Sequence, residues 1–280
     1  KPIVMTSEKE EPGAWGGIHI CGRAHTNAEG GKGSSEIGGA VYGGNDDADN
    51  SGTLQYIRLE YTGFAFDEEH EANGISFYGV GNGTIVDHCQ AYKGSDDGFE
   101  FFGGSVNVSN LVAVSCSDDS FDWTEGWNGK GTNLVAYQEA ESTLGYDCDC
   151  LMECDNNGSN NAATPVAHPV LKNLILVGNG GSKQGIRLRA GTEVEIDNAK
   201  VCGKGQPLTV ETALTENALK NGTSKLTNIT LTSELSSKEG IYTHADFIAV
   251  TSNKVDANLS YSSFEDIRKE CSWMNGSWVK

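Results

Sequence analysis

The chain has 280 residues, of which 36 are glycine and only 5 are proline. This glycine share is about twice the usual ~7%, yet no Gly-x-y period runs through the sequence, which excludes collagen. The formal net charge of −19 disfavours nucleic acids and anionic membranes as partners and favours cations. No apolar run approaches the ~18 residues of a membrane-spanning helix, so we expect no transmembrane segment.

Short segments with alternating apolar and polar residues recur along the chain. The first coil is expected at WGGIHICG (15–22), and the later segments form two interleaved sets. Strands of the first set are predicted at residues 53–63, 84–94, 106–116, 129–139 and 170–180. Strands of the second set are predicted at residues 72–81, 96–105, 118–127, 149–158 and 183–192.

The spacing of these segments predicts the fold class. Corresponding positions recur after as few as 22 residues, from Asp96 to Asp118, which is too short for a strand and a crossover helix. Val, Ile, Tyr and Phe dominate the segments, as is typical of strands. We therefore predict an all-β, single-stranded right-handed parallel β-helix with a C-terminal cap, and keep a β-sandwich as the alternative.

Insertions and a change in pattern divide the chain. Insertions in the repeat predict protruding loops at 64–71, around 140–147 and at 156–168. The repeat is lost in the last part of the sequence. We expect a parallel β-helix with inserted loops over residues 1–235 and a capping segment over 236–280 that covers the open end coil.

Several segments resemble a known family. YGGNDDADNSGTLQYIRLEYTG, NGISFYGVGNGT, DDGFEFFGGSVN, ECDNNG and PVLKNLILVG look like segments of secreted or envelope β-helix proteins from Bacteroidetes. The resemblance covers roughly residues 13–200. It implies the pectin-lyase-like right-handed β-helix and a secreted, periplasmic or outer-surface location, with any signal or lipoprotein anchor outside this chain. It implies no particular activity.

Alignment of the second set of strands predicts an outward-facing column of Ser76, Glu100, Asp122, Glu153 and Arg187. Neighbouring coils lie about 4.8 Å apart, so the three carboxylates repel one another unless one is protonated or a cation bridges them. Oxygen-rich clusters suit Ca²⁺. The column also resembles in outline the acidic residues and arginine of pectate-lyase-type β-helices, in which calcium acidifies the proton beside a uronate carboxylate and a base removes it.

Two further interpretations of this column stay open. Two of the carboxylates could act as general acid and base on a glycosidic bond. Alternatively, the column is the solvated face of an acidic solenoid, and Arg187 is an ion-pair partner of Glu153 rather than a base, since arginine normally stays protonated.

A second column, Asn73, Asp97 and Asp119, precedes the same strands beside glycine or serine. Asn and Asp tolerate left-handed backbone and bond to nearby amides, so a structural turn ladder explains them well. The alternative is calcium bridging, with Asp97, Asp119, Glu100 and Asp122 as the ligands. The acidic loop FDEEHE (66–71) could add ligands or could simply be solvated.

Aromatic and cysteine residues supply two weaker hypotheses. Trp123 stands beside Asp122 in the acidic strand, and Trp127 follows the glycine at the end of that strand. As exposed rings they could stack on sugar faces, although core filling explains them equally well. The run CDCLMEC places three cysteines close together, and with His168 they suggest zinc. Their spacing fits no standard zinc knuckle, so burial as small apolar side chains is the simpler interpretation.

Together these features predict a secreted or envelope-attached β-helix that binds an extended polysaccharide or cell-surface glycan, with Ca²⁺ as the candidate cofactor. One alternative is a polysaccharide lyase or glycoside hydrolase that uses Glu100, Asp122, Glu153 and Arg187. The other is a surface-display or adhesion solenoid without enzymatic activity.

Overall fold

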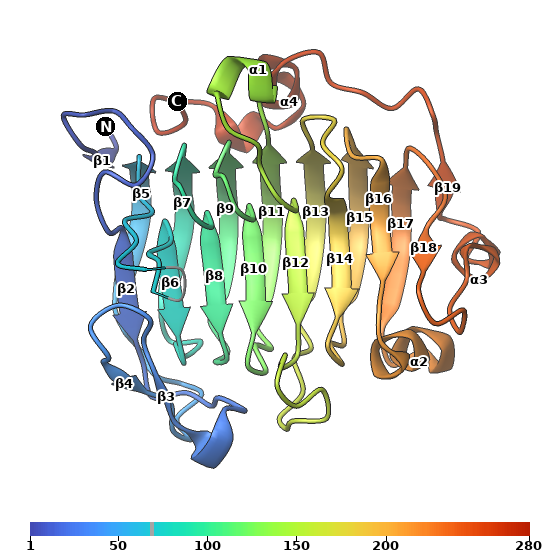
Figure 1. Cartoon of the computed structure of the whole chain (residues 1–280), viewed down its shortest axis with the longest axis horizontal. Coiled ribbons are helices and arrows are strands. Elements are labelled where there is room, and N and C mark those ends of the chain that lie inside the picture. The colour runs from blue at the N-terminus through green and yellow to red at the C-terminus, as the bar shows by residue number, and fades with distance from the viewer. Residues whose placement is uncertain (68–69) are drawn as a thin grey trace.

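Two long parallel sheets run along the molecule on either side of one core, and successive coils contribute a strand to each (Figure 1). The computed structural model describes residues 1–67 and 70–280. The nine-stranded sheet consists of β1 (Ile3–Met5), β5 (Thr53–Glu60), β7 (Ile85–Tyr92), β9 (Asn107–Val114), β11 (Lys130–Tyr137), β13 (Val170–Val177), β15 (Glu195–Cys202), β17 (Lys225–Leu231) and β19 (Lys254–Val255). The eight-stranded sheet consists of β2 (Ile18–Cys21), β6 (Ile75–Tyr78), β8 (Phe99–Phe102), β10 (Phe121–Thr124), β12 (Met152–Asp155), β14 (Gln184–Arg189), β16 (Gln206–Val210) and β18 (Ser236–Ser237).

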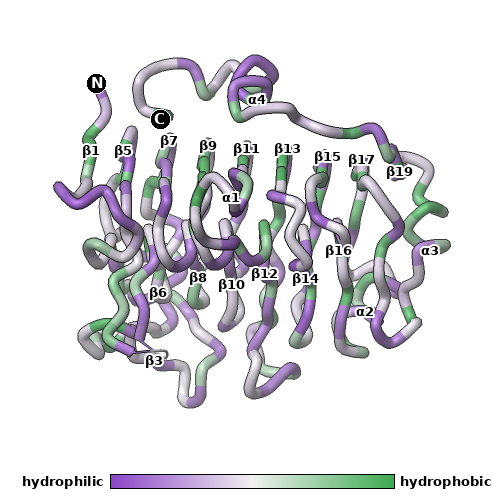
Figure 2. Tube along the Cα trace, turned by 45° about the horizontal axis from the view of Figure 1, so that its top comes forward, coloured by the Kyte–Doolittle hydropathy of each residue, from purple (hydrophilic) through white to green (hydrophobic). Residues whose placement is uncertain are grey.

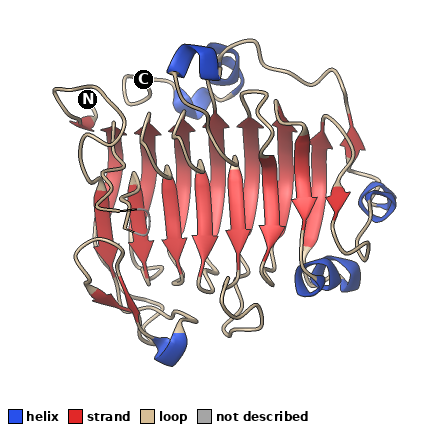
Figure 3. Cartoon of the chain, viewed as in Figure 1, coloured by secondary structure: helices blue, strands red, loops and turns tan. Residues whose placement is uncertain are grey.

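All strand pairs within these two sheets are parallel, which confirms the predicted parallel β-helix and rules out the sandwich. An antiparallel hairpin of β3 (Gly33–Ser34) and β4 (Val41–Tyr42) lies outside both sheets. Helical segments occupy the periphery (Figure 3). They are η1 (Glu29–Gly31), α1 (Glu141–Leu144), α2 (Ala213–Asn221), α3 (His244–Ala249), α4 (Phe264–Glu270) and η2 (Ser272–Met274). Among the described residues, none of these helices is long and apolar enough to cross a membrane.

A single left-handed residue interrupts each long strand of the nine-stranded sheet. Asn110, Asn133, Asn173 and Asn198 have φ values between 56° and 64°, a conformation that asparagine tolerates better than most residues. Their side chains form a ladder, with Asn133 Nδ2 donating to Asn110 Oδ1 at 2.8 Å and Asn173 Nδ2 donating to Asn133 Oδ1 at 3.0 Å. This ladder holds successive coils in register at the bend, and the strand predictions did not include it.

Aromatic stacks fill the core between the sheets. Phe101 stacks on Phe77 at 5.0 Å and on Trp127 at 4.1 Å between ring centroids. Trp123 and Trp127 are each only 1% exposed, so the prediction that they are exposed rings is wrong. Trp123 alternates with the outward Asp122 on β10 and therefore faces inward. Both rings are core residues that cannot stack on a sugar outside the coil.

The C-terminal segment closes one end of the solenoid and covers part of one sheet. Phe247 of α3 is fully buried in the main core cluster at the last coils. Beyond α3, the chain returns along the nine-stranded sheet toward the N-terminal coils (Figures 1 and 2). Ile267, Met274 and Trp278 there pack on outward-facing apolar residues such as Val135. The capping segment therefore also shields a lateral apolar face, and the eight-stranded sheet keeps its own outer face for polar residues.

Candidate functional site

A cavity of about 430 Å³ lies on the outer face of the eight-stranded sheet. We call it the acidic cavity, because ten acidic residues of the described part of the chain line it together with Arg187. The acidic residues are Glu36, Glu71, Asp96, Asp97, Glu100, Asp118, Asp119, Asp122, Asp149 and Glu153. Acidic residues at this density repel one another strongly, so the cavity needs protons or cations to compensate its charge.

The strand register confirms the predicted column. Ser76 pairs with Glu100, Glu100 with Asp122, Asp122 with Glu153, and Glu153 with Arg187, each on the adjacent strand. Flanking residues of these strands, such as Phe99 and Phe101, lie in the core. Because side chains alternate between the two faces of a β-strand, each residue of the column points outward while the residues before and after it point into the core.

The predicted turn ladder is present at Asp97 and Asp119, whereas the side chain of Asn73 donates to Ser76 and Glu100 instead. Asp97 Oδ1 accepts a hydrogen bond from the backbone N–H of Asp119 at 2.8 Å, and Asp119 Oδ1 accepts one from the backbone N–H of Cys150 at 2.6 Å. A Cβ on Gly98 would lie 2.6 Å from the carbonyl oxygen of Ser120, so glycine is required where the coils approach this closely. Asp97 and Asp119 therefore hold the turns together while also lining the acidic cavity.

Burial dominates the electrostatics of the acidic cavity, and the neighbouring carboxylates add to its effect. Both raise the pKa of Asp97, Glu100, Asp119 and Asp122 well above the ordinary values. Burial, followed by the charge of Asp149, raises the pKa of Asp118 to about 6. Burial also raises the pKa of Glu36 and of Asp96 to about 7. Without a cation, the cavity therefore retains protons near neutral pH.

Among the residues that the structure describes, four groups of side chains could hold a metal ion, each with ligand atoms within 4.8 Å of one another. The groups are Asp96–Asp97–Asp118, Asp97–Glu100–Asp122, Asp119–Asp122–Glu153 and Asp119–Asp149–Cys150. They share Asp97, Asp122 and Asp119 and so form a continuous row along the solenoid.

Ion pairs with basic side chains distinguish these groups. Lys183 Nζ lies 2.5 Å from Asp149 Oδ2, and Glu153 binds the guanidinium groups of Arg187 and Arg189. The groups that contain Asp149 or Glu153 are therefore already partly neutralised.

Two groups, Asp96–Asp97–Asp118 and Asp97–Glu100–Asp122, have no member that forms an ion pair with a residue in the described part of the chain. The second of them has a further feature. Asp122 Oδ1 is buried and has no hydrogen-bond partner among the described residues. Glu100 Oε2 accepts a hydrogen bond from Asn73 Nδ2 at 2.6 Å, which orients that carboxylate. This group is the strongest candidate for a cation site.

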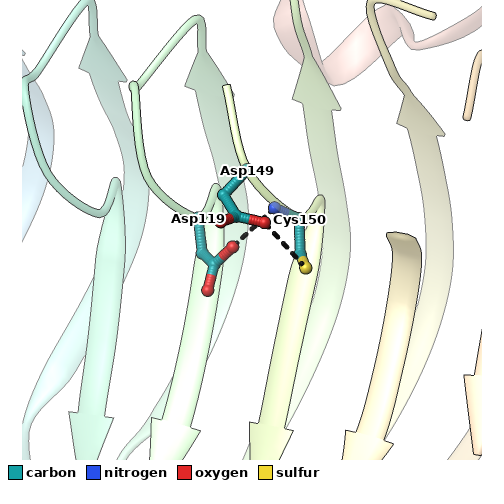
Figure 4. Close-up of side chains that lie close together, drawn as sticks. All are labelled: Asp119, Asp149 and Cys150. Atoms are coloured by element: carbon teal, nitrogen blue, oxygen red, sulfur yellow. Dashed lines mark hydrogen bonds between the residues drawn. The ribbon is translucent and has the colours of Figure 1, made fainter. Parts of the chain in front are cut away.

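The group at the other end of the row has a structural explanation. Figure 4 shows Asp119, Asp149 and Cys150 close together on neighbouring coils. The backbone N–H of Cys150 donates to Asp119 Oδ1, and its thiol lies 3.3 Å from Asp149 Oδ1. Burial raises the pKa of the Cys150 thiol, which disfavours a thiolate ligand. Cys154 lies in the core, and His168 Nδ1 lies 2.8 Å from Glu193 Oε2. The cysteines and histidine of the zinc hypothesis are therefore not assembled into one of the candidate groups.

Arg187 is held as an ion-pair partner. Its guanidinium lies 2.9 Å from Glu153 Oε1 and 3.2 Å from Glu211 Oε1. Burial alone would lower the pKa of Arg187, but the hydrogen bonds and charges of Glu211 and Glu153 outweigh burial and raise it. The expected partnership with Glu153 is confirmed, and an arginine held in this way is a poor candidate for a catalytic base.

Sequence reasoning missed part of the cavity wall. Glu36 lies between β3 and β4, and its Oε2 accepts a hydrogen bond from the hydroxyl of Tyr78 at 3.0 Å. Its acidity was the only signal in the sequence, because the hairpin has no counterpart in the repeat. From the acidic loop 66–71, Glu71 lines the cavity, whereas Glu68 and Glu69 lie outside the described residues.

A family model described as a pectate-lyase-like beta helix domain matches residues 1–279 of the chain. Comparisons with curated proteins and with solved structures gave no match. The matched region includes every residue that lines the acidic cavity.

Proposed function

Because the chain belongs to the family of pectate-lyase-like beta helix domains, we propose that it binds an extended polysaccharide outside the cytoplasm and that its acidic cavity holds Ca²⁺. The observation that carries the proposal is the group Asp97–Glu100–Asp122. Its carboxylates lie within ligand-sharing distance without an ion-pair partner among the described residues, and Asp122 Oδ1 is buried without a hydrogen bond.

The chemistry of the acidic cavity favours calcium over other common cations. Ca²⁺ accepts six to eight oxygen ligands in flexible geometry, whereas Mg²⁺ demands a near-ideal octahedron and retains its water. The donors of the group Asp97–Glu100–Asp122 are all carboxylate oxygens on adjacent strands and turns. Such a set of ligands suits a hard cation. A bound calcium ion replaces the protons that the cavity otherwise needs.

A cation also connects this cavity to a polysaccharide. An anionic glycan is repelled by a chain of net charge −19 unless a cation lies between them. The row of candidate groups follows the solenoid axis from β8 to β12. Such a row matches the extended shape of a polysaccharide chain better than that of a compact small molecule.

The proposal is tested by measuring the binding of neutral and acidic polysaccharides in the presence of calcium and in the presence of excess chelator. A calcium concentration of about 2 mM suits the experiment, because it is comparable with the dissociation constants of weak extracellular calcium sites. We expect binding that requires Ca²⁺ and that the double variant Glu100→Gln/Asp122→Asn loses. The matched control is Glu141→Gln/Glu234→Gln, which removes two exposed carboxylates elsewhere on the chain. Glycan binding that is equal in calcium and in chelator would refute the calcium bridge. Absence of all glycan binding would refute the proposed function and favour a surface-display or adhesion solenoid instead.

Catalysis is a second candidate, and the raised pKa of Glu100 favours it. A carboxyl group that stays protonated near neutral pH can act as a general acid on a glycosidic oxygen. Incubation with the bound polysaccharide distinguishes the reactions, because hydrolysis releases reducing ends alone and β-elimination also yields an unsaturated uronate that absorbs ultraviolet light. An enzyme must lose this turnover in Glu100→Gln, and binding without new ends excludes catalysis.

A further inference from the structure

Two exposed aromatic rings lie on the loop between β5 and β6. Phe66 is 69% exposed and Phe64 is 43% exposed. Their rings meet edge to face with 5.0 Å between centroids. Phenyl rings exposed to water lose the stabilisation that burial provides, so an exposed pair beside a cavity is a feature that a ligand can use.

Phe66 lines a second cavity of about 400 Å³. Ser34, Gly38, Gly39 and His70 contribute to its wall. A Cβ on Gly38 would meet no atom within 4 Å, which leaves open space beside the ring. An aromatic face together with hydroxyl and backbone groups is the combination that recognises a pyranose, which presents a flat C–H face and a rim of hydroxyls.

This second cavity adjoins the acidic cavity. Glu36 lines both of them, and its hydrogen bond from Tyr78 fixes the carboxylate at the boundary. A polysaccharide chain that extends from the group Asp97–Glu100–Asp122 past Glu36 therefore reaches Phe66. No lysine or arginine lines the second cavity among the described residues, and the carboxylate of Glu36 at its boundary disfavours an acidic sugar.

We propose that Phe66, supported by Phe64, is a stacking subsite for a neutral pyranose of the polysaccharide bound at the acidic cavity. This inference rests on the proposed function and adds a substrate class to it, namely a glycan that carries neutral as well as acidic sugars. Nucleic acids, whose bases also stack on aromatic rings, are disfavoured because their phosphates would face the acidic wall.

The test uses calorimetric titration of the full chain in Ca²⁺ with neutral xylo-, gluco- and galacto-oligosaccharides and, separately, with oligogalacturonate. We expect Phe66→Ala to weaken the binding of the neutral oligosaccharide that wild type binds best by about tenfold, the value of one stacking contact. Phe66→Tyr keeps the ring and should bind like wild type. Leu214→Ala, which truncates another exposed apolar side chain on α2, is the control and should also bind normally.

The outcomes separate this inference from the proposed function. Wild-type affinity of Phe66→Ala for neutral oligosaccharides, with calcium-dependent glycan binding intact, would overturn the subsite alone. Failure of wild type to bind any glycan would overturn both. Because Phe66 is mostly exposed, Phe66→Ala should keep the wild-type melting temperature and calcium affinity, and these two measurements show that the variant is folded.

Discussion

Asp122 concentrates the electrostatic strain of the acidic cavity at a single residue. It lies between Glu100 and Glu153 in the strand register, and burial followed by the charge of Glu153 raises its pKa well above the ordinary value. Its buried Oδ1 has no hydrogen-bond donor among the described residues. Ionised Asp122 thus destabilises the folded state in the absence of a cation, and in the presence of a cation it can serve as a ligand.

Replacing Asp122 tests this balance directly. In chelator at pH 8, we expect Asp122→Asn to increase the free energy of unfolding by about 1–3 kcal/mol. The substitution replaces a buried carboxyl group, which must bind a proton or carry a like charge, with a neutral amide that can donate to Glu100 or Glu153. In saturating Ca²⁺, the same variant should be less stable than wild type. Urea denaturation under both conditions measures the two differences.

The surface variant Glu234→Gln, outside the acidic cavity, is the control and should change stability by less than about 0.5 kcal/mol in either condition. If Asp122→Asn were less stable than wild type in chelator as well, its carboxylate would be structural rather than strained.

At the scale of the elements, regular alternation and spacing were sufficient to predict the strands from β5 to β14, whereas the strands from β15 onward were not predicted individually. Stacked coils leave little freedom in register, so the column from Ser76 to Arg187 follows from the sequence. The same alternation predicts that Trp123 faces the core, and the expectation of an exposed ring overlooks it. Trp127 follows Gly126, whose φ of 86° ends the alternation, so the sequence pattern no longer determines its side.

Contacts between distant, non-repeating segments could not be predicted. Glu36 contacts Tyr78 across 42 residues, and the β3–β4 hairpin has no equivalent elsewhere in the repeat that would place it. Phe66 lies on the insertion 64–71, which is also outside the repeat, so its position could not be predicted either. The asparagine ladder, by contrast, has a sequence signal, because Asn110, Asn133 and Asn173 occupy the same position in successive strands.

The cap α3 supplies a prediction about an element. Phe247 is fully buried against the last coils, so Phe247→Ala should cost about 3–5 kcal/mol of stability and expose the terminal strands to other chains. Urea denaturation and light scattering measure both effects. The neighbouring Ile248 is 39% exposed, and Ile248→Ala should cost far less. Equal effects of the two substitutions would show that α3 does not close the core.

For the whole molecule, the charge of the acidic cavity couples stability to pH. The folded pKa values of about 6 for Asp118 and about 7 for Glu36 and Asp96 lie above the ordinary values of carboxyl groups. The folded state therefore binds more protons than the unfolded state, and this contribution to stability is complete below pH ~4 and lost as the pH rises through 6–7.

We accordingly expect the melting temperature in chelator to fall between pH 5 and pH 8. Millimolar Ca²⁺ should reverse most of this fall at pH 8, since a ligand of the deprotonated folded state stabilises it. Scanning calorimetry at several pH values with and without calcium gives both curves. A melting temperature in chelator that rises steadily to pH 8 would contradict the raised pKa values.

The most direct test of the central claim is a calorimetric titration of chelator-stripped protein with Ca²⁺ at pH 7. We expect saturable binding with a release of protons, seen as a binding heat that depends on the ionisation enthalpy of the buffer. Glu100→Gln/Asp122→Asn should abolish this binding, and Glu141→Gln/Glu234→Gln should retain it. Absence of saturable binding to the wild type, or equal binding to the Glu100→Gln/Asp122→Asn variant, would contradict a calcium site in the acidic cavity.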